Sequence, residues 1–144
     1  MSNTFEIDPD LVDEIDDAEP LIVAPKGTYS LKITDWLADE EGNTIREDKN
    51  GLPFCMPVLS IFGTDNDDKY KTLNLFIPLP SGKVKDAKKR NARFVQFKKI
   101  CTAFSWDFKD EFNVRERLGS DCEAILDVKN GGQYGDQNEI TSFV

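Results

Sequence analysis

The chain contains one stretch with the apolar period of a long helix, and the segments on either side of it alternate as strands do. In residues 90–104, Phe94, Phe97, Cys101 and Phe104 recur every three or four positions, which predicts a helix with one buried stripe. The other apolar segments are shorter and alternate between apolar and polar residues, which is the period of a half-buried strand. The helix therefore separates the strands that precede it from those that follow it.

Five segments are predicted to be strands: residues 28–37, 54–62, 69–77, 122–129 and 139–144. In the first, Leu31 and Ile33 share the inner face, whereas Lys32 and Trp36 share the outer one. Pro57 marks an edge or a bulge in the second. Glycine-rich turn chemistry joins the last two segments.

The order of three strands, a helix and two strands is that of the OB-fold, a five-stranded, partly open Greek-key barrel. We therefore expect a mainly β protein: an OB-fold-like five-stranded Greek-key barrel with one long amphipathic helix between strands 3 and 4, plus an acidic N-terminal arm. The arm is assigned to residues 1–25 and the barrel to residues 26–144. A β-sandwich and an α+β sheet remain open, because element order alone does not determine topology.

The only strongly basic part of the chain leads into the helix. Residues 83–99 hold eight bases and one acid, a local charge of +7 in a chain whose net charge is −9. Such a local field indicates an anionic partner, and phosphate backbones are the commonest one. Because residues 81–89 lack an apolar period, we expect a mobile basic loop there, with Asp86 or Asn91 capping the helix. The candidate phosphate contacts are Lys83, Lys85, Lys88, Lys89 and Arg90. The alternative is a solvated helix face beside a flexible loop.

The first twenty residues carry eight acids and no base. Asp8 followed by Pro9 is a typical helix start, and Leu11, Val12 and Ile15 form a short apolar stripe. One hypothesis is a solubilising disordered tail. The other is a peptide that covers the basic patch or docks onto a partner, with Asp10, Leu11, Asp13, Glu14, Ile15, Asp16 and Asp17 as the partner-binding residues.

The residue types present make an enzyme the weaker class. There is no histidine, which removes most familiar general-base and nucleophile-activation schemes. The cysteines, Cys55, Cys101 and Cys122, are far apart in sequence, which favours buried free thiols over a metal site. The acids at residues 65–68 are predicted to form a turn, because they lack the ligand spacing of a calcium loop. We expect no catalytic residue, no metal and no cofactor.

No apolar run approaches the ~20 residues that a membrane-spanning helix needs, and the N-terminus lacks the pattern of a signal peptide. We therefore expect a soluble, cytoplasmic protein with no membrane partner. An edge strand such as residues 139–144 would allow pairing between subunits, so a homo-oligomer stays open.

Sequence-tolerant binding of single strands needs cations along the phosphates and exposed aromatic faces for the bases. Trp36, Tyr70 and Phe76 lie on the polar faces of the first and third predicted strands, beside Lys32. The usual OB-fold binding surface adds the loops between strands 1 and 2 and strands 4 and 5, which here contribute Arg46, Lys49, Lys129 and Tyr134. The alternative is that a second hydrophobic layer covers these aromatics.

Over residues 26–144 the chain resembles the small single-stranded-DNA-binding proteins encoded in bacteriophage replication and recombination cassettes. The resemblance is carried by GTYSLKITDW, by the paired strands MPVLSIFG and YKTLNLFI, by the helix RFVQFKKICTAFSWDF, and by the closing hairpin in LGSDCEAILDVKNGGQYGDQNEITSF. It implies a non-enzymatic protein that coats replication or recombination intermediates in the host-cell cytoplasm. It also implies recruitment of replication or recombination proteins through an acidic tail, which many members carry at the C-terminus and this chain carries at the N-terminus.

Three other functions stay open. The chain is alternatively a protein-interaction module whose acidic arm mimics DNA or inhibits a host protein. It is otherwise a phage structural or assembly protein. A hydrolase is the weakest alternative, because no residue is nominated as a nucleophile.

Overall fold

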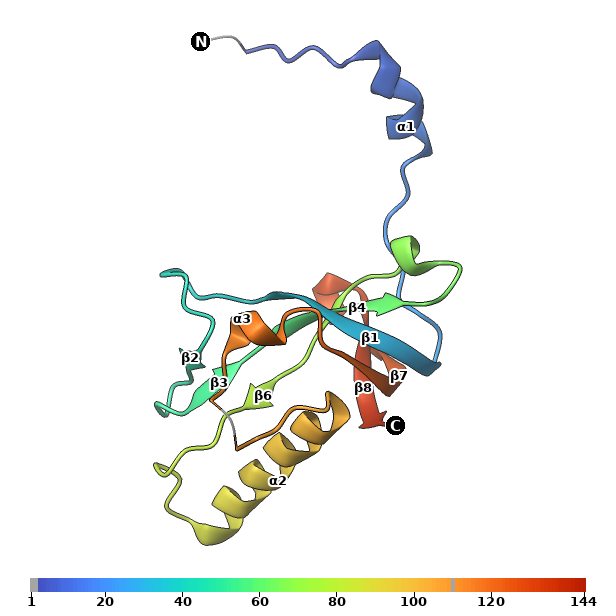
Figure 1. Cartoon of the computed structure of the whole chain (residues 1–144). Helices are drawn as coiled ribbons and strands as arrows, with labels where there is room; N and C mark the ends of the chain where they lie inside the picture. The colour runs from blue at the N-terminus through green and yellow to red at the C-terminus, as the bar shows by residue number, and fades with distance from the viewer. Residues whose placement is uncertain (1–2, 110) are drawn as a thin grey trace.

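The computed structural model describes residues 3–109 and 111–144, with the exception of the Tyr134 side chain. The fold is mainly β, as predicted. Its centre is a five-stranded antiparallel sheet with the order β5-β4-β1-β7-β8. The outer strands β5 and β8 contact each other, so the sheet curls into a nearly closed barrel (Figure 1). The strands are β1 Gly27–Trp36, β4 Pro57–Phe62, β5 Leu73–Asn74, β7 Asp121–Asn130 and β8 Asp136–Phe143.

A small second sheet adjoins the barrel. It has the order β2-β3-β6, with bounds Arg46–Glu47, Pro53–Cys55 and Ile77–Pro78. The segment predicted as one strand over residues 54–62 is therefore two strands, because the chain leaves the small sheet at Met56 and enters the barrel at Pro57. Proline has no N–H for the ladder, which suits it to this break. The predicted strand 69–77 is likewise divided between β5 and β6.

The long helix α2, Ala87–Ala103, packs against β6 at one end of the barrel (Figure 1). Asp86 is its cap and accepts a hydrogen bond from the Lys89 backbone N–H at 2.9 Å. The expectation that a loop extends to residue 89 is therefore wrong. Because Asp86 begins the helix, Lys88, Lys89 and Arg90 belong to its first turn.

The buried stripe of α2 is shorter than predicted. Phe97, Ile100 and Cys101 are buried, and Phe104 follows them into the core. Phe94, in contrast, is 40% exposed, so its place in the buried stripe is wrong. The reason is that the barrel covers only the C-terminal half of the helix.

A β-bulge in β1 reverses the predicted orientation of Trp36. The register of β1 against β4 shifts between Ile33 and Asp35, and an extra residue at a bulge turns the following side chains to the opposite face. Trp36 is consequently only 9% exposed and belongs to the core. Its expected position on the outer face with Lys32 is wrong.

The core fills the barrel and its junction with α2. Its fully buried side chains come from both sheets and the helix: Leu31, Ile33, Cys55, Pro57, Leu59, Ile77, Ile100, Cys101 and Leu126. The three cysteines are free and buried, as the sequence pattern predicts. Burial raises the pKa of the Cys55 and Cys122 thiols to about 12 each.

The N-terminal segment lies outside the barrel until residue 22. A short 3-10 helix, Pro9–Leu11, precedes α1, Val12–Asp17, and the Asp8 carboxylate accepts from the Asp10 N–H at 2.9 Å. Ile22 then pairs with the chain at Tyr70. The Asn138 side chain binds both backbone groups of Ala24, which joins this segment firmly to β8. No helix in the described ranges is both long and apolar enough to cross a membrane.

Candidate nucleic-acid interface

Two phenylalanines and an arginine form a stack on the small sheet. Arg46 of β2 pairs with Phe54 of β3, so its guanidinium lies over the Phe54 ring, 5.2 Å from the centroid. Phe76, just before β6, stacks on the same ring at 5.1 Å with an angle of 29° between the planes. Phe54 is buried, whereas Phe76 is 41% exposed. An exposed ring backed by a fixed ring is a platform on which a planar group can stack.

Beside Phe76 a groove runs between β5 and β8. It has a volume of about 270 Å³, and Phe76 and Lys129 both line it. The remaining walls are largely polar: Thr72, Asn74, Gln137, Asn138 and Glu139, with Leu73, Leu75 and Ile140. The Lys71 ammonium donates to the Asp136 carbonyl at 3.1 Å and so ties the β4–β5 connection to the end of this groove. The groove therefore offers one aromatic ring, the cation of Lys129, the carboxyl group of Glu139 and several uncharged hydrogen-bonding groups.

The loop before α2 lies against the loop between β2 and β3. Lys83 donates from its ammonium to the Gly51 carbonyl at 3.2 Å, and exposed Lys49 is in the same loop as Gly51. Lys85 bonds to the Gly82 carbonyl and Arg90 to the Val84 carbonyl, at 3.4 and 3.3 Å. Lys83 and Lys49 are thus brought together, while Arg90 is half-buried and holds the loop in shape.

Two aspartates order the loop that carries Arg46 and Lys49. Asp48 accepts from the N–H groups of Asn50 and Leu52, and Asp39 accepts from those of Glu41 and Asn43. The bond from Leu52 holds the pKa of Asp48 below its usual value, and the bond from Asn43 does the same for Asp39. These turns present the basic side chains from an ordered backbone.

Arg93 was not singled out from the sequence, yet it connects the interface to the helix. Its guanidinium donates to the Leu79 carbonyl at 2.7 Å and also to the Pro53 carbonyl. It therefore joins α2 to β3 and to the chain after β6. The signal in the sequence was an arginine on the partly apolar face of the predicted helix. The carbonyl groups that it binds are distant in sequence, so the pattern did not indicate them.

Other predicted residues lie apart from this surface. Lys32 is exposed on β1 with its ammonium 5.0 Å from the centre of the Phe62 ring, a pairing that sequence reasoning missed. The outward position of Phe62 at the end of an alternating strand was the signal for it. Tyr70 is half-buried and meets Tyr29 edge-on at 6.3 Å, so it offers little free face. Burial, and then the neighbouring Tyr70, raise the pKa of Tyr29.

Lys88 and Lys89 are exposed on the first turn of α2. Tyr134 falls in the turn between β7 and β8, but its side chain is outside the described part of the structure. All seven partner-binding residues predicted in the N-terminal segment are exposed on the two short helices there: Asp10, Leu11, Asp13, Glu14, Ile15, Asp16 and Asp17.

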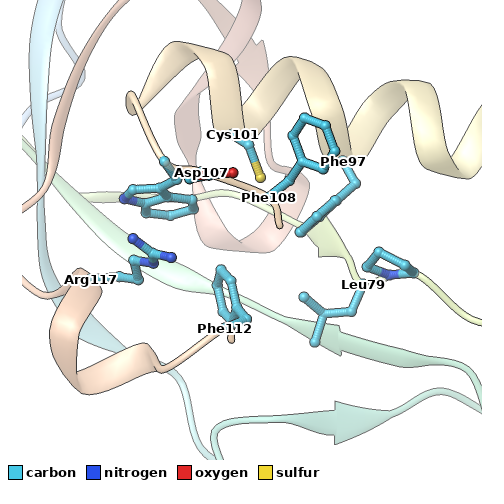
Figure 2. A pocket seen from close by; sticks show the side chains of 9 residues that line it. Leu79, Phe97, Cys101, Asp107, Phe108, Phe112 and Arg117 are labelled. Carbon is cyan, nitrogen blue, oxygen red and sulfur yellow. The ribbon is translucent and has the colours of Figure 1, made fainter. Parts of the chain in front are cut away.

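An aromatic cavity of about 200 Å³ lies where α2 ends (Figure 2). The Arg117 guanidinium lies 5.3 Å from the Trp106 ring and 5.7 Å from the Phe112 ring, and its Nε is buried without a hydrogen-bond partner. Cys101 points into the same space, and burial raises the pKa of its thiol. Raised thiol pKa values suit packing rather than nucleophilic attack.

The acidic turn after β4 is held by its own hydrogen bonds. The Thr64 hydroxyl and the Thr64 and Gly63 N–H groups all donate to Asp67, and the hydroxyl contributes most to lowering the pKa of that carboxyl. Within residues 3–109 and 111–144, no group of three His, Cys, Asp or Glu side chains is arranged to hold a metal ion. Comparison with known proteins gives no family: no protein-family model matches the chain, and no curated protein matches it.

Proposed function

We propose that this protein binds single-stranded DNA without sequence preference, through base stacking on Phe76 and phosphate contacts along the neighbouring cations. The observation that carries the proposal is the Arg46–Phe54–Phe76 stack, whose exposed ring, Phe76, lines the groove that Lys129 also lines. A base on Phe76 would have its phosphates within the field of Arg46 and Lys129. Stacking of this kind tolerates every base, because each base has a π face.

The strand arrangement supports an OB-fold interpretation. In an OB-fold the third and fifth strands complete the ring, and here β5 and β8 are in contact at the ends of the order β5-β4-β1-β7-β8. The helix α2 lies between the third and fourth strands of that ring in sequence, as in the OB-fold. The stack and the groove then occupy the face and loops that OB-folds use for oligonucleotides.

The basic loop extends the phosphate path away from the groove. Lys83 and Lys49 lie on neighbouring loops, and Lys85, Lys88 and Lys89 continue the positive charge onto α2. Under this proposal the protein is a non-enzymatic, phage-type DNA-coating protein that acts in replication or recombination in the host cytoplasm. The acidic N-terminal segment is then an arm beside the binding domain as far as residue 21, because Ile22 pairs with the chain at Tyr70 and Ala24 is part of the core.

The test is a titration of a fluorescently labelled oligo-dT with the full chain, followed by anisotropy at two salt concentrations. A duplex of equal length is titrated in parallel. We expect tighter binding to the single strand. We also expect weaker binding at higher salt, because binding releases counterions from the DNA and this release is less favourable when the bulk salt concentration is high. An absence of binding at low salt, or equal binding to the duplex, would overturn the proposal.

A further inference from the structure

A second groove runs between α2 and β8 and adjoins the first, with which it shares Leu75 and Ile140. It has a volume of about 1080 Å³. Half of its lining side chains are apolar, and they come from both elements and from the chain after β5: Leu75, Val95, Ile100, Ala103, Ile140, Phe143 and Val144. The others are Lys98 and Lys99, both exposed, and the uncharged polar side chains of Gln96, Thr102, Ser105, Thr141 and Ser142. The groove thus combines apolar side chains with two cations.

The N-terminal segment presents the complementary chemistry. Residues 9–17 form one short helical stretch that leaves three apolar side chains exposed. The exposed fractions are 45% for Leu11, 51% for Val12 and 56% for Ile15. Five carboxylates accompany them: Asp10, Asp13, Glu14, Asp16 and Asp17. Nine residues of helix extend about 14 Å and are marginal alone, because so short a helix does not repay its nucleation. A segment of this kind needs a surface to cover its apolar side chains.

The groove and the segment match in two independent respects. The apolar stripe fits the apolar side chains of the groove, where burial removes exposed surface on both sides. The carboxylates fit Lys98 and Lys99, which attract them over a Debye length of about 8–10 Å at moderate salt. An amphipathic helix lying in an apolar groove is a common recognition mode.

The segment does not lie in the groove of its own molecule. Leu11, Val12 and Ile15 stay exposed, and the residues that line the groove all fall between 75 and 144. The chain is held outside the groove at Ile22 and Ala24. In Figure 1 α1 and α2 lie on opposite sides of the barrel.

We propose that residues 8–17 of one molecule dock in the groove between α2 and β8 of a second copy, with Lys98 and Lys99 receiving the carboxylates. Two copies can exchange their segments reciprocally, which gives a closed dimer. This inference does not depend on DNA binding. Its failure and the failure of the proposed function are therefore separate results.

The first experiment is sedimentation velocity of the full chain over a range of concentrations at low and high salt. We expect a dimer at low salt that dissociates as salt rises. The variant K98E/K99E should dissociate at least about tenfold more readily, since two attractive pairs become repulsive. The matched control K88E/K89E changes the same charge on the same helix outside the groove, and should stay within about twofold of the wild type.

The second experiment separates a second copy from any other occupant. A chain with D13K/D16K/D17K and the K98E/K99E chain are each expected to be monomeric. Mixed together, they should form a heterodimer, because the reversed segment now fits the reversed groove. Circular dichroism checks that each variant is folded.

Three results would overturn the inference. The first is a wild-type chain that remains monomeric at all concentrations. A segment that docks within its own molecule or onto another protein would give that result. The second is a dimer that neither K98E/K99E nor D13K/D16K/D17K weakens. The third is a mixture that fails to associate although both variants are folded.

Discussion

Phe76 stacks on Phe54 with ring centroids 5.1 Å apart, so an exposed ring rests on a buried one. Phe54 lies in β3 and Phe76 just before β6, and the whole of β4 and β5 separates them in the chain. Phe54 also carries the Arg46 guanidinium, so the exposed ring rests on a buried ring that has a second neighbour of its own. A platform held in this way loses little rotamer freedom when a base stacks on it.

Replacing Phe76 with alanine should weaken oligo-dT binding by about 5- to 100-fold, since one stacked base is worth about 1–3 kcal/mol. The Phe62→Ala variant removes a phenylalanine from the outer face beside Lys32 and should change affinity by no more than about twofold. Anisotropy titration measures both, and thermal melting confirms that they are folded. Equal losses in the two variants would move the binding surface to the outer face.

Charge reversal at Lys49 and Lys83 should flatten the salt dependence of binding. Each lost phosphate contact lowers the slope of log K against log salt by about 0.7 for a single strand. The double variant K49E/K83E should therefore lose up to about 1.4 from the slope, equally for all sequences. Lys26→Glu controls for net charge and should leave the slope nearly unchanged. A slope that stays at the wild-type value would remove these two loops from the interface.

Trp36 should take no part in binding, because β1 turns it into the core, where it meets Phe112 edge-on. Trp36→Phe should leave oligo-dT affinity within about twofold and lower stability by about 1–2 kcal/mol. The Trp36 Nε1 group is buried without a hydrogen-bond partner, so removing it recovers part of the stability that is lost with the packing. Denaturant unfolding and anisotropy test the two statements. A folded variant with strongly reduced affinity would show that Trp36 contacts DNA.

Asn138 should be among the most sensitive polar positions. It accepts from the Ala24 N–H and donates to the Ala24 and Asp127 carbonyls, at 2.9, 2.9 and 3.2 Å, while buried. Asn138→Ala leaves those backbone groups without a partner and should lower the free energy of unfolding by about 2–4 kcal/mol. Asn138→Asp keeps the acceptor but places negative charge beside two carbonyls, so it should be at least as destabilising at pH 7. Urea unfolding gives both values, and an alanine variant as stable as the wild type would contradict this role.

The buried thiols should make stability fall at alkaline pH. Burial raises the pKa of Cys55 and Cys122 to about 12 each, whereas a thiol in the unfolded chain titrates at about 8.5. Between these values the unfolded chain releases protons that the folded chain keeps, so the free energy of unfolding decreases as pH rises. Below about pH 8 the thiols are neutral in both states and contribute no pH dependence.

Alkylation provides the direct measurement. At pH 8.5 iodoacetamide should label the native chain far more slowly than the chain unfolded in guanidinium, because the thiolate is the nucleophile. A Cys122→Ala variant should lose less stability between about pH 9 and 12 than the wild type. Rapid labelling of all three cysteines in the native chain would contradict their burial.

The parts of the fold that local pattern controls could be predicted. The mainly β class, the neighbourhoods of the five barrel strands and the buried thiols all follow from alternation and helical period, and Asp86 is one of the two caps that the sequence offered. The outward position of Phe76 also followed from alternation. The positions of Phe94 and Trp36 did not, because the extent of a helix contact and the presence of a bulge depend on what packs against them.

The candidate interface shows the same division. Sequence reasoning named Arg46, Phe76, Lys83 and Lys129 separately. The stack of Phe76 on Phe54 and the contact of Lys83 with Gly51 join residues that are 22 and 32 positions apart in the chain. Periodicity carries no information about such pairs, since it records only which face a residue occupies.

By itself the sequence determined the strand-rich class, the single long helix, the separation of acidic and basic charge, and the absence of histidine chemistry. These properties depend on residue types and on spacings of two to four positions. Only the tertiary structure decided that Trp36 is core, that Phe76 rests on Phe54, and that two grooves lie along β8. Those outcomes depend on strand register and on long-range packing, which are settled when the barrel closes and not by any local stretch of chain.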